Sequence, residues 1–311
     1  MRAGLVRRQK GPTAHTGESG FIVIAVLWIL AALSALVLIY LTFVTNTAVV
    51  VAGNADRVQT EALIEAGVEL AAFQLTSRTE AMRPTSGTFN ARLGSGRMFV
   101  TFRSEAARID LNTASKGLLA GLMVGLGATP SNAAGYADRI VSWRMPAGSG
   151  EDDSENSLYR VSGASYLPRH APYPSVGELW LVRGIPPDIV ERVLPFVTVF
   201  SNLAQVNVRD AAPQVLAGLP NMTPERLQSL LSQRSDPALE PVALIGMAGE
   251  GATVAGSQAY RVDVEVELLN GRRAAAEIVI LLLETGDEPY RVLSWRNAAD
   301  GSTLPQRAAS R

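Results

Sequence analysis

Apolar residues form one unbroken run near the start of the chain. Residues 21–44 comprise 24 positions without a charge, glycine or proline. In helical form this run is about 36 Å long, enough to cross a hydrocarbon core of about 30 Å with some tilt. Basic residues precede it and predict that its N-terminal end stays in the cytoplasm; they are Arg2, Arg7, Arg8 and Lys10. The pattern therefore predicts a single-pass anchor with an outward-facing body.

A cleaved secretory signal peptide is the alternative for this run. Signal peptides have shorter apolar cores that end in a small-residue cleavage site. No such site closes residues 21–44, which continue into Thr45-Asn46-Thr47. The small residue that borders the run is Gly20, and it precedes the run, whereas a signal-peptide cleavage site would follow it. The sequence therefore favours a retained anchor.

The helical period continues beyond the apolar run, over residues 45–78. Apolar residues recur every three or four positions there, with charged residues between them. Together with the span this predicts one helix of roughly 60 residues, on the order of 85 Å long, with Gly53 and Gly67 as weak points. We expect the recurring apolar set to pack on a soluble domain; it consists of Val51, Ala55, Val58, Ala62, Ala66, Leu70 and Phe73.

Alternating patterns on both sides of the middle of the chain predict strands. Turn residues separate them, Gly94-Ser95-Gly96 in the first part and Asn270-Gly271 in the second, and the second pair is a strong hairpin signal. These strands can share one sheet if the segment between them is an insertion. The expected strand segments are 88–104 as a hairpin, then 260–268, 274–283 and 290–295.

Leucine- and alanine-rich short helices fill the middle of the chain, residues 109–250, and predict an all-α segment. A capped short helix, a glycine-containing turn and a second short helix occur three times in succession. The copies begin at Ile109, Tyr173 and Val206. This pattern is typical of a helix-hairpin-helix repeat.

Local signals refine this middle segment. Ser175 with Glu178 fits a capping box, and Thr223-Pro224 fits an N-cap followed by proline. A long polar loop, residues 145–167, separates the first two copies. Core packing is the default expectation for three tryptophans, Trp143, Trp180 and Trp295.

Composition excludes several chemistries. The 311 residues include no cysteine, which excludes disulfides, thiolate catalysis and cysteine-ligated metals. The two histidines are His15 and His170, too few for a histidine metal cluster. No nucleophile elbow, carboxylate dyad or phosphate loop accompanies His170, so we expect a loop histidine and no enzyme. A net charge of -1 gives no overall basic field for nucleic acid or lipid.

Three segments have a distinctive sequence and follow one another in a fixed order: Ala107–Ala114, Ala171–Gly184 and Val206–Pro213. Together they resemble the minor pseudopilin K family of type II secretion, the general secretion pathway. Two closing strands, Tyr260-Arg-Val262 and Tyr290–Trp295, are also similar, so that the resemblance covers about 20–297. It implies an α+β, pilin-like fold, in which a long N-terminal helix packs on an antiparallel sheet, with an inserted all-α helix-hairpin-helix domain.

The resemblance also implies a division of the chain. We expect a cytoplasmic leader peptide, an anchored helix, a pilin-like domain in two parts around the insertion, and a flexible tail. The corresponding ranges are 1–20, 21–44, 45–108 with 251–297 around 109–250, and 298–311.

Prepilin peptidase processing is a further implication. The peptidase of this family cuts after the glycine before the apolar run, which implies cleavage between Gly20 and Phe21 and N-methylation of Phe21. Most pilins carry Glu at the fifth mature position, where this chain has Ala25. A carboxylate in lipid is costly unless it is paired, so an apolar residue suits a subunit with no neighbour above it. Ala25 thus marks a tip position.

The same resemblance implies where the protein lies in the cell and which proteins it binds. We expect a subunit in the inner membrane, with its C-terminal domain periplasmic. Its expected partners are the other minor pseudopilins, of I and J types, and the major pseudopilin, and its expected role is to start pseudopilus assembly for protein export. No nucleic acid is expected among the partners.

An acidic group in the polar loop is the candidate metal site. Glu151, Asp152, Asp153 and Glu155 can supply the oxygens that Ca²⁺ prefers, although their spacing is not that of an EF-hand. A solvated acidic loop is the alternative. No other cofactor is expected.

A membrane-anchored periplasmic DNA-binding protein is the second function considered. Helix-hairpin-helix units can hold phosphate on backbone N–H groups at a helix start. That function predicts lysine-rich hairpins and a terminal helical domain. Here lysine is nearly absent and strands follow the repeats.

The processing prediction can be tested directly. Co-expression with prepilin peptidase should remove residues 1–20, and Gly20→Leu should prevent this because a bulky side chain replaces the small residue at the cut. Intact-mass spectrometry of the membrane-extracted protein measures the outcome. A wild-type chain that keeps its full length beside an active peptidase would contradict the prediction.

Overall fold

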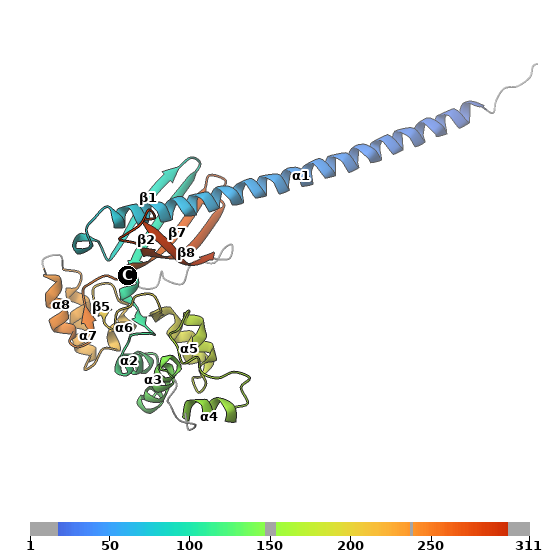
Figure 1. The fold of residues 1–311 in the computed structure, drawn as a ribbon. Helices are drawn as coiled ribbons and strands as arrows, with labels where there is room; N and C mark the ends of the chain where they lie inside the picture. Colours follow the sequence, from blue (N-terminus) through green and yellow to red (C-terminus); the bar gives the residue numbers. More distant parts are fainter. Residues whose placement is uncertain (1–17, 147–153, 237–238, 298–311) are drawn as a thin grey trace, which may run out of the picture. The chain divides into compact units, whose positions relative to one another are not determined.

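The computed structural model describes residues 18–146, 154–236 and 239–297 (Figure 1). The chain divides into two compact units between Gln59 and Thr60. Helix α1 (Glu18–Thr76) contributes its first part to one unit and its last part to the other. The first unit contains Phe21–Val44, a segment long and apolar enough to cross a membrane. The predicted long helix is therefore confirmed from Glu18 to Thr76.

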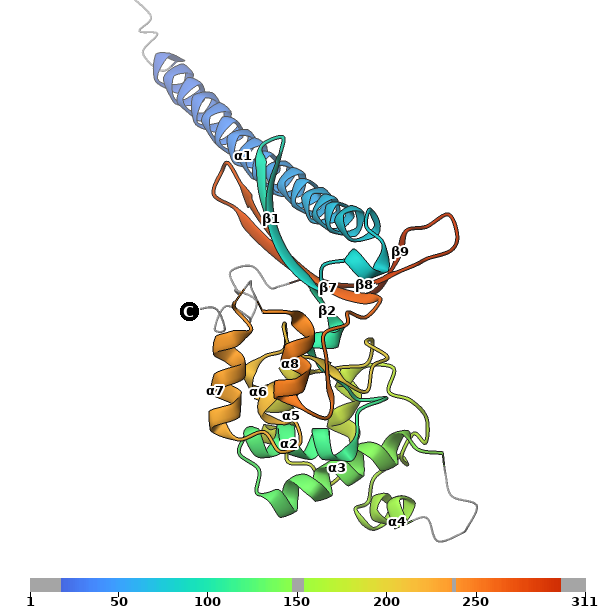
Figure 2. The ribbon, with the colours of Figure 1, turned by 90° about the vertical axis from the view of Figure 1, so that its left-hand side faces the viewer.

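A five-stranded antiparallel sheet lies in the second unit, with the strand order β1-β2-β7-β8-β9 (Figure 2). Both predicted hairpins are confirmed, and Gly94 and Gly271 adopt the positive φ that their turns require. Strands β2 and β7 are neighbours although the whole middle segment separates them in sequence. The strands are β1 (Ser86–Leu93), β2 (Gly96–Ser104), β7 (Ala259–Leu268), β8 (Arg273–Leu282) and β9 (Tyr290–Asn297), and the short 3₁₀ helix η1 (Glu80–Met82) precedes them.

The last part of α1 packs on one face of this sheet. Its side chains Leu63, Val68 and Leu75 are buried in one cluster with sheet residues such as Val264 and Ile278. Full burial of each such side chain stabilises the fold by about 1.5–3 kcal/mol. Alternation along β7 and β8 places their apolar residues on the helix side.

Gly67 lies on the face of α1 that packs against the sheet. A Cβ atom at this position would lie 2.8 Å from Val264 Cγ1 and 3.2 Å from Val100 Cγ2. The absent side chain therefore permits the close approach. Packing offsets the loss of helix propensity, which is about 1 kcal/mol for glycine.

The apolar set of α1 that was expected to cover the soluble domain is not the one that does so. Ala62, Leu70 and Phe73 from the predicted set are exposed. The buried set lies roughly one residue further along and includes Leu63 and Ala71. The helix thus carries two apolar faces, and the sheet buries one of them.

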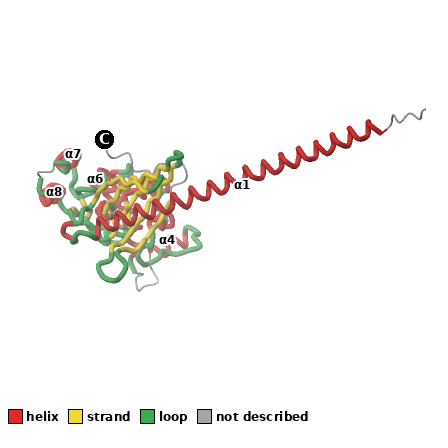
Figure 3. Tube along the Cα trace, turned by 90° about the horizontal axis from the view of Figure 1, so that it is seen from above, coloured by secondary structure: helices red, strands yellow, loops and turns green. Residues whose placement is uncertain are grey.

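Residues between β2 and β7 form short helices around a hydrophobic core of their own (Figures 1 and 3). Two short parallel strand pairs, β3 with β4 and β5 with β6, were not part of the expected all-α segment. The elements are η2 (Glu105–Ala107), β3 (Ile109–Asp110), α2 (Lys116–Gly125), α3 (Pro130–Arg144), α4 (Ser154–Val161), η3 (Val176–Leu181), α5 (Pro187–Val193), η4 (Leu194–Phe196), β4 (Val197–Thr198), β5 (Val206–Asn207), α6 (Pro213–Ala217), α7 (Pro224–Gln233), α8 (Pro241–Ala248) and β6 (Ala252–Thr253).

The first and third copies of the predicted repeat begin with the same backbone turn. An Asp110 carboxylate oxygen accepts a hydrogen bond from Asn112 N at 2.7 Å, and Asn207 Oδ1 accepts one from Arg209 N at 2.9 Å. Both are side-chain turns of the Asx kind. Each turn starts at a short strand that is paired in parallel with another. These polar side chains build the backbone turns of the repeat.

The capping predictions have different outcomes. Ser175 makes no side-chain cap and precedes the 3₁₀ helix η3, so the capping box there was wrong. Glu178 instead accepts a hydrogen bond from Trp143 Nε1 at 3.1 Å, because the fold brings a buried donor to it. Thr223 caps α7 as predicted and accepts from Arg226 N at 3.3 Å.

The predicted polar loop contains helix α4, which the sequence did not indicate. Tyr159 anchors it as a buried side chain, with its ring centroid 5.9 Å from Trp143 and 5.8 Å from Tyr166. Its hydroxyl accepts a hydrogen bond from Arg183 N at 2.9 Å. The aromatic contacts come from other parts of the chain, and they hold a helix whose own composition is polar.

Only Trp143 among the three tryptophans expected in the core is buried there. Trp180 is 50% exposed and Trp295 is 37% exposed. Trp295 stands on the edge strand β9, which has a neighbour on one side only in the sheet. The expectation was therefore wrong for Trp180 and Trp295.

Two glycines bring α2 and α6 into backbone contact, and this contact yields a stability prediction. A Cβ at Gly121 would overlap the carbonyl oxygen of Gly218, which is backbone and cannot rotate away. Gly121→Ala should therefore lower the free energy of unfolding by about 2–3 kcal/mol. Urea unfolding of the detergent-solubilised chain, followed by circular dichroism, measures this.

Gly246 in α8 offers a matched control, because a Cβ there meets no atom within 4 Å. Gly246→Ala should leave the free energy of unfolding unchanged or raise it by up to about 1 kcal/mol. Equal stability of the two variants would contradict the role given to Gly121.

Candidate functional site

The predicted processing residues lie on consecutive turns of α1. Gly20 is in its first turn, Phe21 follows with an exposed side chain, and Ala25 is half-buried one turn later. All three are part of the same helix as the apolar segment. Cleavage at Gly20 and the role of Ala25 stay predictions.

The predicted calcium ligands are not brought together among the described residues. Glu151, Asp152 and Asp153 lie outside these residues. Glu155 is buried in α4, and its Oε2 accepts a hydrogen bond from Arg139 Nη1 at 3.1 Å. An arginine occupies the oxygen that a cation would use. Within the described ranges, no three His, Cys, Asp or Glu side chains are grouped to hold a metal ion.

The open face of α1 is the candidate interaction surface, which we call the outer stripe: Ala62, Leu70 and Phe73. Phe73 is 69% exposed, unusual for a large aromatic side chain on a packed helix. The stripe lies on the side of α1 turned away from the sheet, because the residues between its members are buried on the sheet. An apolar helix face without a cover is suited to another helix.

The flank of α1 next to β9 is fixed by a hydrogen bond. Tyr290 Oη donates to Glu69 Oε1 at 2.8 Å and joins β9 to the helix. Burial and the neighbouring Glu69 carboxylate raise the pKa of Tyr290 to about 12. The tyrosine therefore stays protonated and keeps donating over the whole physiological pH range.

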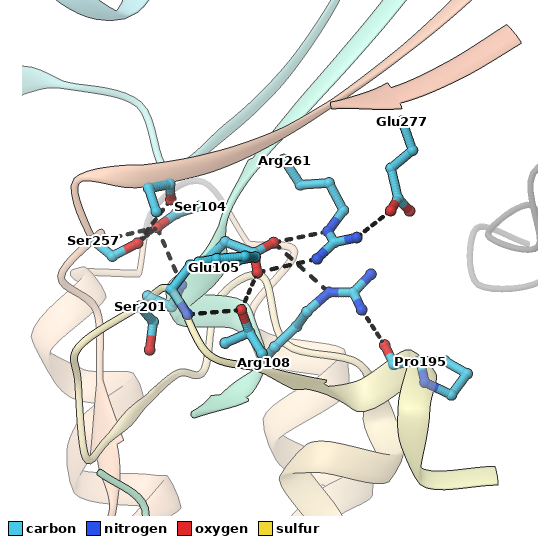
Figure 4. Close-up of polar contacts among 12 residues, drawn as sticks. Ser104, Glu105, Arg108, Pro195, Ser201, Ser257, Arg261 and Glu277 are labelled. Carbon is cyan, nitrogen blue, oxygen red and sulfur yellow. Dashed lines mark hydrogen bonds and ion pairs between the residues drawn. The ribbon is translucent and has the colours of Figure 1, made fainter. Parts of the chain in front are cut away.

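A buried polar junction connects the sheet to the helical segment (Figure 4). Glu105, at the end of β2, accepts from Arg261 of β7 through both oxygens, with Nε–Oε1 at 2.8 Å and Nη2–Oε2 at 3.1 Å. The same carboxylate accepts from the Thr198 hydroxyl on β4. Arg108 reaches across to the carbonyl of Pro195 at 2.6 Å. The two sides of the second unit are thus joined through one carboxylate.

The charges in this junction compensate one another. Burial by itself raises the pKa of Glu105, but Arg261 outweighs this effect and the pKa lies below its usual value. Burial lowers the pKa of Arg108 to about 10, with nearby Arg261 adding to the shift. Arg261 also contacts Glu277, which in turn pairs with Arg296. A bidentate arginine–carboxylate pair of this kind sets geometry as well as charge.

The junction is a structural centre. The cavity beside Arg108 and Asp263 has a volume of about 10 Å³, which is at the lower limit for holding one water molecule. Ligand pockets are larger, from about 300 Å³. His170 Nδ1 lies 3.0 Å from the Met145 carbonyl oxygen and Nε2 lies 3.1 Å from Asn156 Oδ1, as expected for a loop histidine.

Two of the cations in the helical segment form ion pairs with carboxylates on its surface. Arg169 pairs with Glu178 at 2.8 Å, and Lys116 pairs with Asp138 at 2.5 Å. A nucleic-acid surface needs clustered positive charge directed outward to phosphates. These pairs do not favour the DNA-binding alternative.

Sequence reasoning named the residues of the outer stripe but assigned them to the face buried on the soluble domain, and it missed the junction. The exposure of the stripe could have been anticipated, because the sequence contains a second apolar set at helical spacing, from Leu63 to Leu75, that competes for burial. Glu105 and Arg261 are 156 positions apart, and no local pattern connects them. Only the pairing of β2 with β7 brings them together.

Comparisons with known proteins agree with this fold. The family model described as type II secretion system (T2SS), protein K, matches residues 101–202. A curated relative, type II secretion system protein K of Pseudomonas aeruginosa, is 24% identical over 197 residues, which cover 59% of this chain. The chain spans 57% of the length of that relative.

A solved structure shares the fold. A chain of the crystal structure of the GspK-GspI-GspJ complex from the enterotoxigenic Escherichia coli type 2 secretion system superposes with a TM-score of 0.54 at 15% identity. The match covers 78% of this chain and 95% of that one. The resemblance to the pseudopilin K family of type II secretion is thus confirmed, together with the mixed α+β fold and N-terminal helix.

Asp263 gives the junction a pH-dependent stability. Burial and the carboxylate of Glu277, opposite it on β8, raise the pKa of Asp263 to about 6 from 3.8. The folded state therefore binds this proton more tightly than the unfolded state. Its contribution to stability is present at low pH and is lost as the pH rises from about 4 to about 6.

Asp263→Asn should remove this loss. We expect the variant to exceed the wild type in free energy of unfolding by about 1–2 kcal/mol at about pH 7.5, with the difference shrinking toward zero near pH 4. Urea unfolding at several pH values measures both chains. A variant that is less stable at neutral pH would contradict the assignment.

Proposed function

We propose that this chain is a minor pseudopilin of K type that acts in type II secretion by assembling with other pseudopilins. Its apolar helix anchors it in the inner membrane, with the N-terminus cytoplasmic and the body periplasmic. The match of the family model, the curated relative and the shared fold support this function. The basic residues before the apolar segment support the orientation.

The outer stripe of α1 is the observation that carries the proposal. A helix buried on one face by its own sheet would be polar on its opposite face if it worked alone. Here Leu70 and Phe73 are exposed there instead. An apolar stripe on a helix pairs best with a second helix of similar character. The partners proposed are minor pseudopilins of I and J types, since the solved structure with this fold comes from a GspK-GspI-GspJ complex.

A position at the tip of the pseudopilus follows from two features. Ala25 lacks the carboxylate with which most pilins are thought to hold the amine of a neighbour, so no charge needs a partner in lipid. The helical segment adds bulk to the body that a subunit stacked above would have to avoid. We therefore propose that the chain starts assembly with the I and J types and is followed by the major pseudopilin.

Maturation by prepilin peptidase completes the proposal. Cleavage between Gly20 and Phe21 would remove the charged side chains that precede the apolar run, Glu18 among them, and this suits transfer of the helix out of the membrane into a filament. Glu151, Asp152 and Asp153 are kept as proposed calcium ligands, whereas Glu155 serves the ion pair with Arg139.

The partner surface can be tested with one substitution. Phe73→Glu should abolish copurification of the full chain with I- and J-type pseudopilins, because it buries a charge in an apolar helix contact. Co-expression followed by affinity purification in detergent measures the loss.

Val242→Glu is the matched control, since Val242 on α8 is also 69% exposed but lies outside α1. It should copurify as the wild type does. Full complex formation by Phe73→Glu would overturn the proposed use of the outer stripe.

A further inference from the structure

A row of glutamates follows the exposed side of α1. Glu61, Glu65 and Glu69 are spaced four residues apart, and all three are exposed. Residues four apart lie one above the other on a helix. The three side chains therefore share one line along α1, which we call the acidic row.

The acidic row borders the outer stripe. Ala62 follows Glu61 by one position and Leu70 follows Glu69 by one position, so each apolar residue lies on the adjacent line of the helix. Phe73 is one turn beyond Glu69 and continues the line of the acidic row itself. A helix that covers the outer stripe therefore meets the acidic row along the edge of the contact.

No opposite charge within this stretch of α1 balances the row. Its three glutamates are the only charged residues between positions 58 and 77. The side chains of Glu61 and Glu65 make no hydrogen bond or ion pair with any residue that the structure describes. Arg57 precedes Glu61 by one turn, so the excess of negative charge is greatest at Glu65 and Glu69.

Strand β9, which is bonded to the row, does not supply the missing positive charge. Tyr290 donates a hydrogen bond to Glu69 but brings no charge. Arg296 pairs with Glu277, whose neighbours on β8 are buried against α1, so this pair lies on the opposite face of the sheet. Arg291 follows Tyr290 and lies on that opposite face as well, because successive residues of a strand alternate.

A row of one sign is unfavourable for a helix that stays in water. Like charges four residues apart repel one another and weaken the helix, whereas solvated surfaces mostly intersperse both signs. The row is not a metal site either, since within the described ranges no three acidic or histidine side chains are grouped to hold a metal ion. A positively charged partner beside the outer stripe explains the row.

We propose that the acidic row selects the partner helix that covers the outer stripe: a helix with lysine or arginine residues four apart beside its apolar face. This inference rests on the proposed function and adds the chemistry by which the partner is recognised. Opposite charges at the edge of an apolar contact speed association and fix the register, and like charges there exclude wrong partners. Because the row is exposed to water, its attraction decreases as salt is added.

Charge reversal of the row tests this inference. Glu61→Lys/Glu65→Lys leaves Glu69 unchanged, and the control Glu191→Lys/Glu250→Lys makes the same change of charge at exposed glutamates outside α1. Each full chain is co-expressed with I- and J-type pseudopilins and purified in detergent at several salt concentrations. The amount of partner retained per chain is then measured.

We expect Glu61→Lys/Glu65→Lys to retain about tenfold less partner than the wild type at low salt, because two attractions are replaced by two repulsions. The difference should shrink as salt is added, and the control should match the wild type. Glu61→Gln/Glu65→Gln, which removes the charge without reversing it, should lose about threefold. Each chain alone should melt no earlier than the wild type, since the changed side chains are exposed.

Rescue by the partner identifies the opposing charge. Single lysine or arginine residues in the helices of the I- and J-type partners are changed to glutamate, and at least one such change should restore binding of Glu61→Lys/Glu65→Lys. The inference is overturned if no change restores binding, if the variant retains as much partner as the control, or if its loss is independent of salt.

The outcome is separable from that of the proposed function. A wild type that binds the pseudopilins, loses them with Phe73→Glu and keeps them with Glu61→Lys/Glu65→Lys contradicts this inference alone. A wild type that binds neither pseudopilin contradicts the proposed function, and this inference with it.

Discussion

The buried pair of Glu105 and Arg261 holds the second unit of this protein together. Glu105 closes the strand on which the chain leaves the sheet, and Arg261 stands on the strand on which the chain returns. Removing Arg261 would leave the buried Glu105 with only the more distant Arg108 to compensate its charge, and breaking a buried pair in this way costs about 3–5 kcal/mol. Because Thr198 of the helical segment bonds to the same carboxylate, one group orients both sides of the junction. The long middle segment can thus be an insertion without disturbing the sheet.

Helix α1 combines three environments in one element. Its first part is apolar all round, as lipid requires, and its last part has one face buried by the sheet and one apolar face open. A folded domain with an exposed apolar helix face favours association, because a partner that covers Leu70 and Phe73 removes their apolar surface area from water. In the proposed function, the same helix therefore serves both as the membrane anchor and as the surface for assembly.

Polar side chains of the helical segment stabilise its backbone turns and its packing. Asp110 and Asn207 form backbone turns, and Glu178 holds Trp143 and Arg169. Such fully engaged polar groups specify a rigid core, because an unpaired buried group would be costly. The function proposed for this protein accordingly depends on a surface, the outer stripe of α1.

Local pattern alone determined the membrane segment, the long helix, both hairpins and the Thr223 cap, because each depends on neighbours in sequence. It also carried the family resemblance. Tertiary structure decided which apolar face of α1 is buried, since two faces were available and only contact with Val264 and Val100 selects one. It also decided that α4 is a helix, that Glu178 bonds to Trp143 and that Glu105 meets Arg261. Those outcomes depend on partners far away in sequence, and no local spacing encodes them.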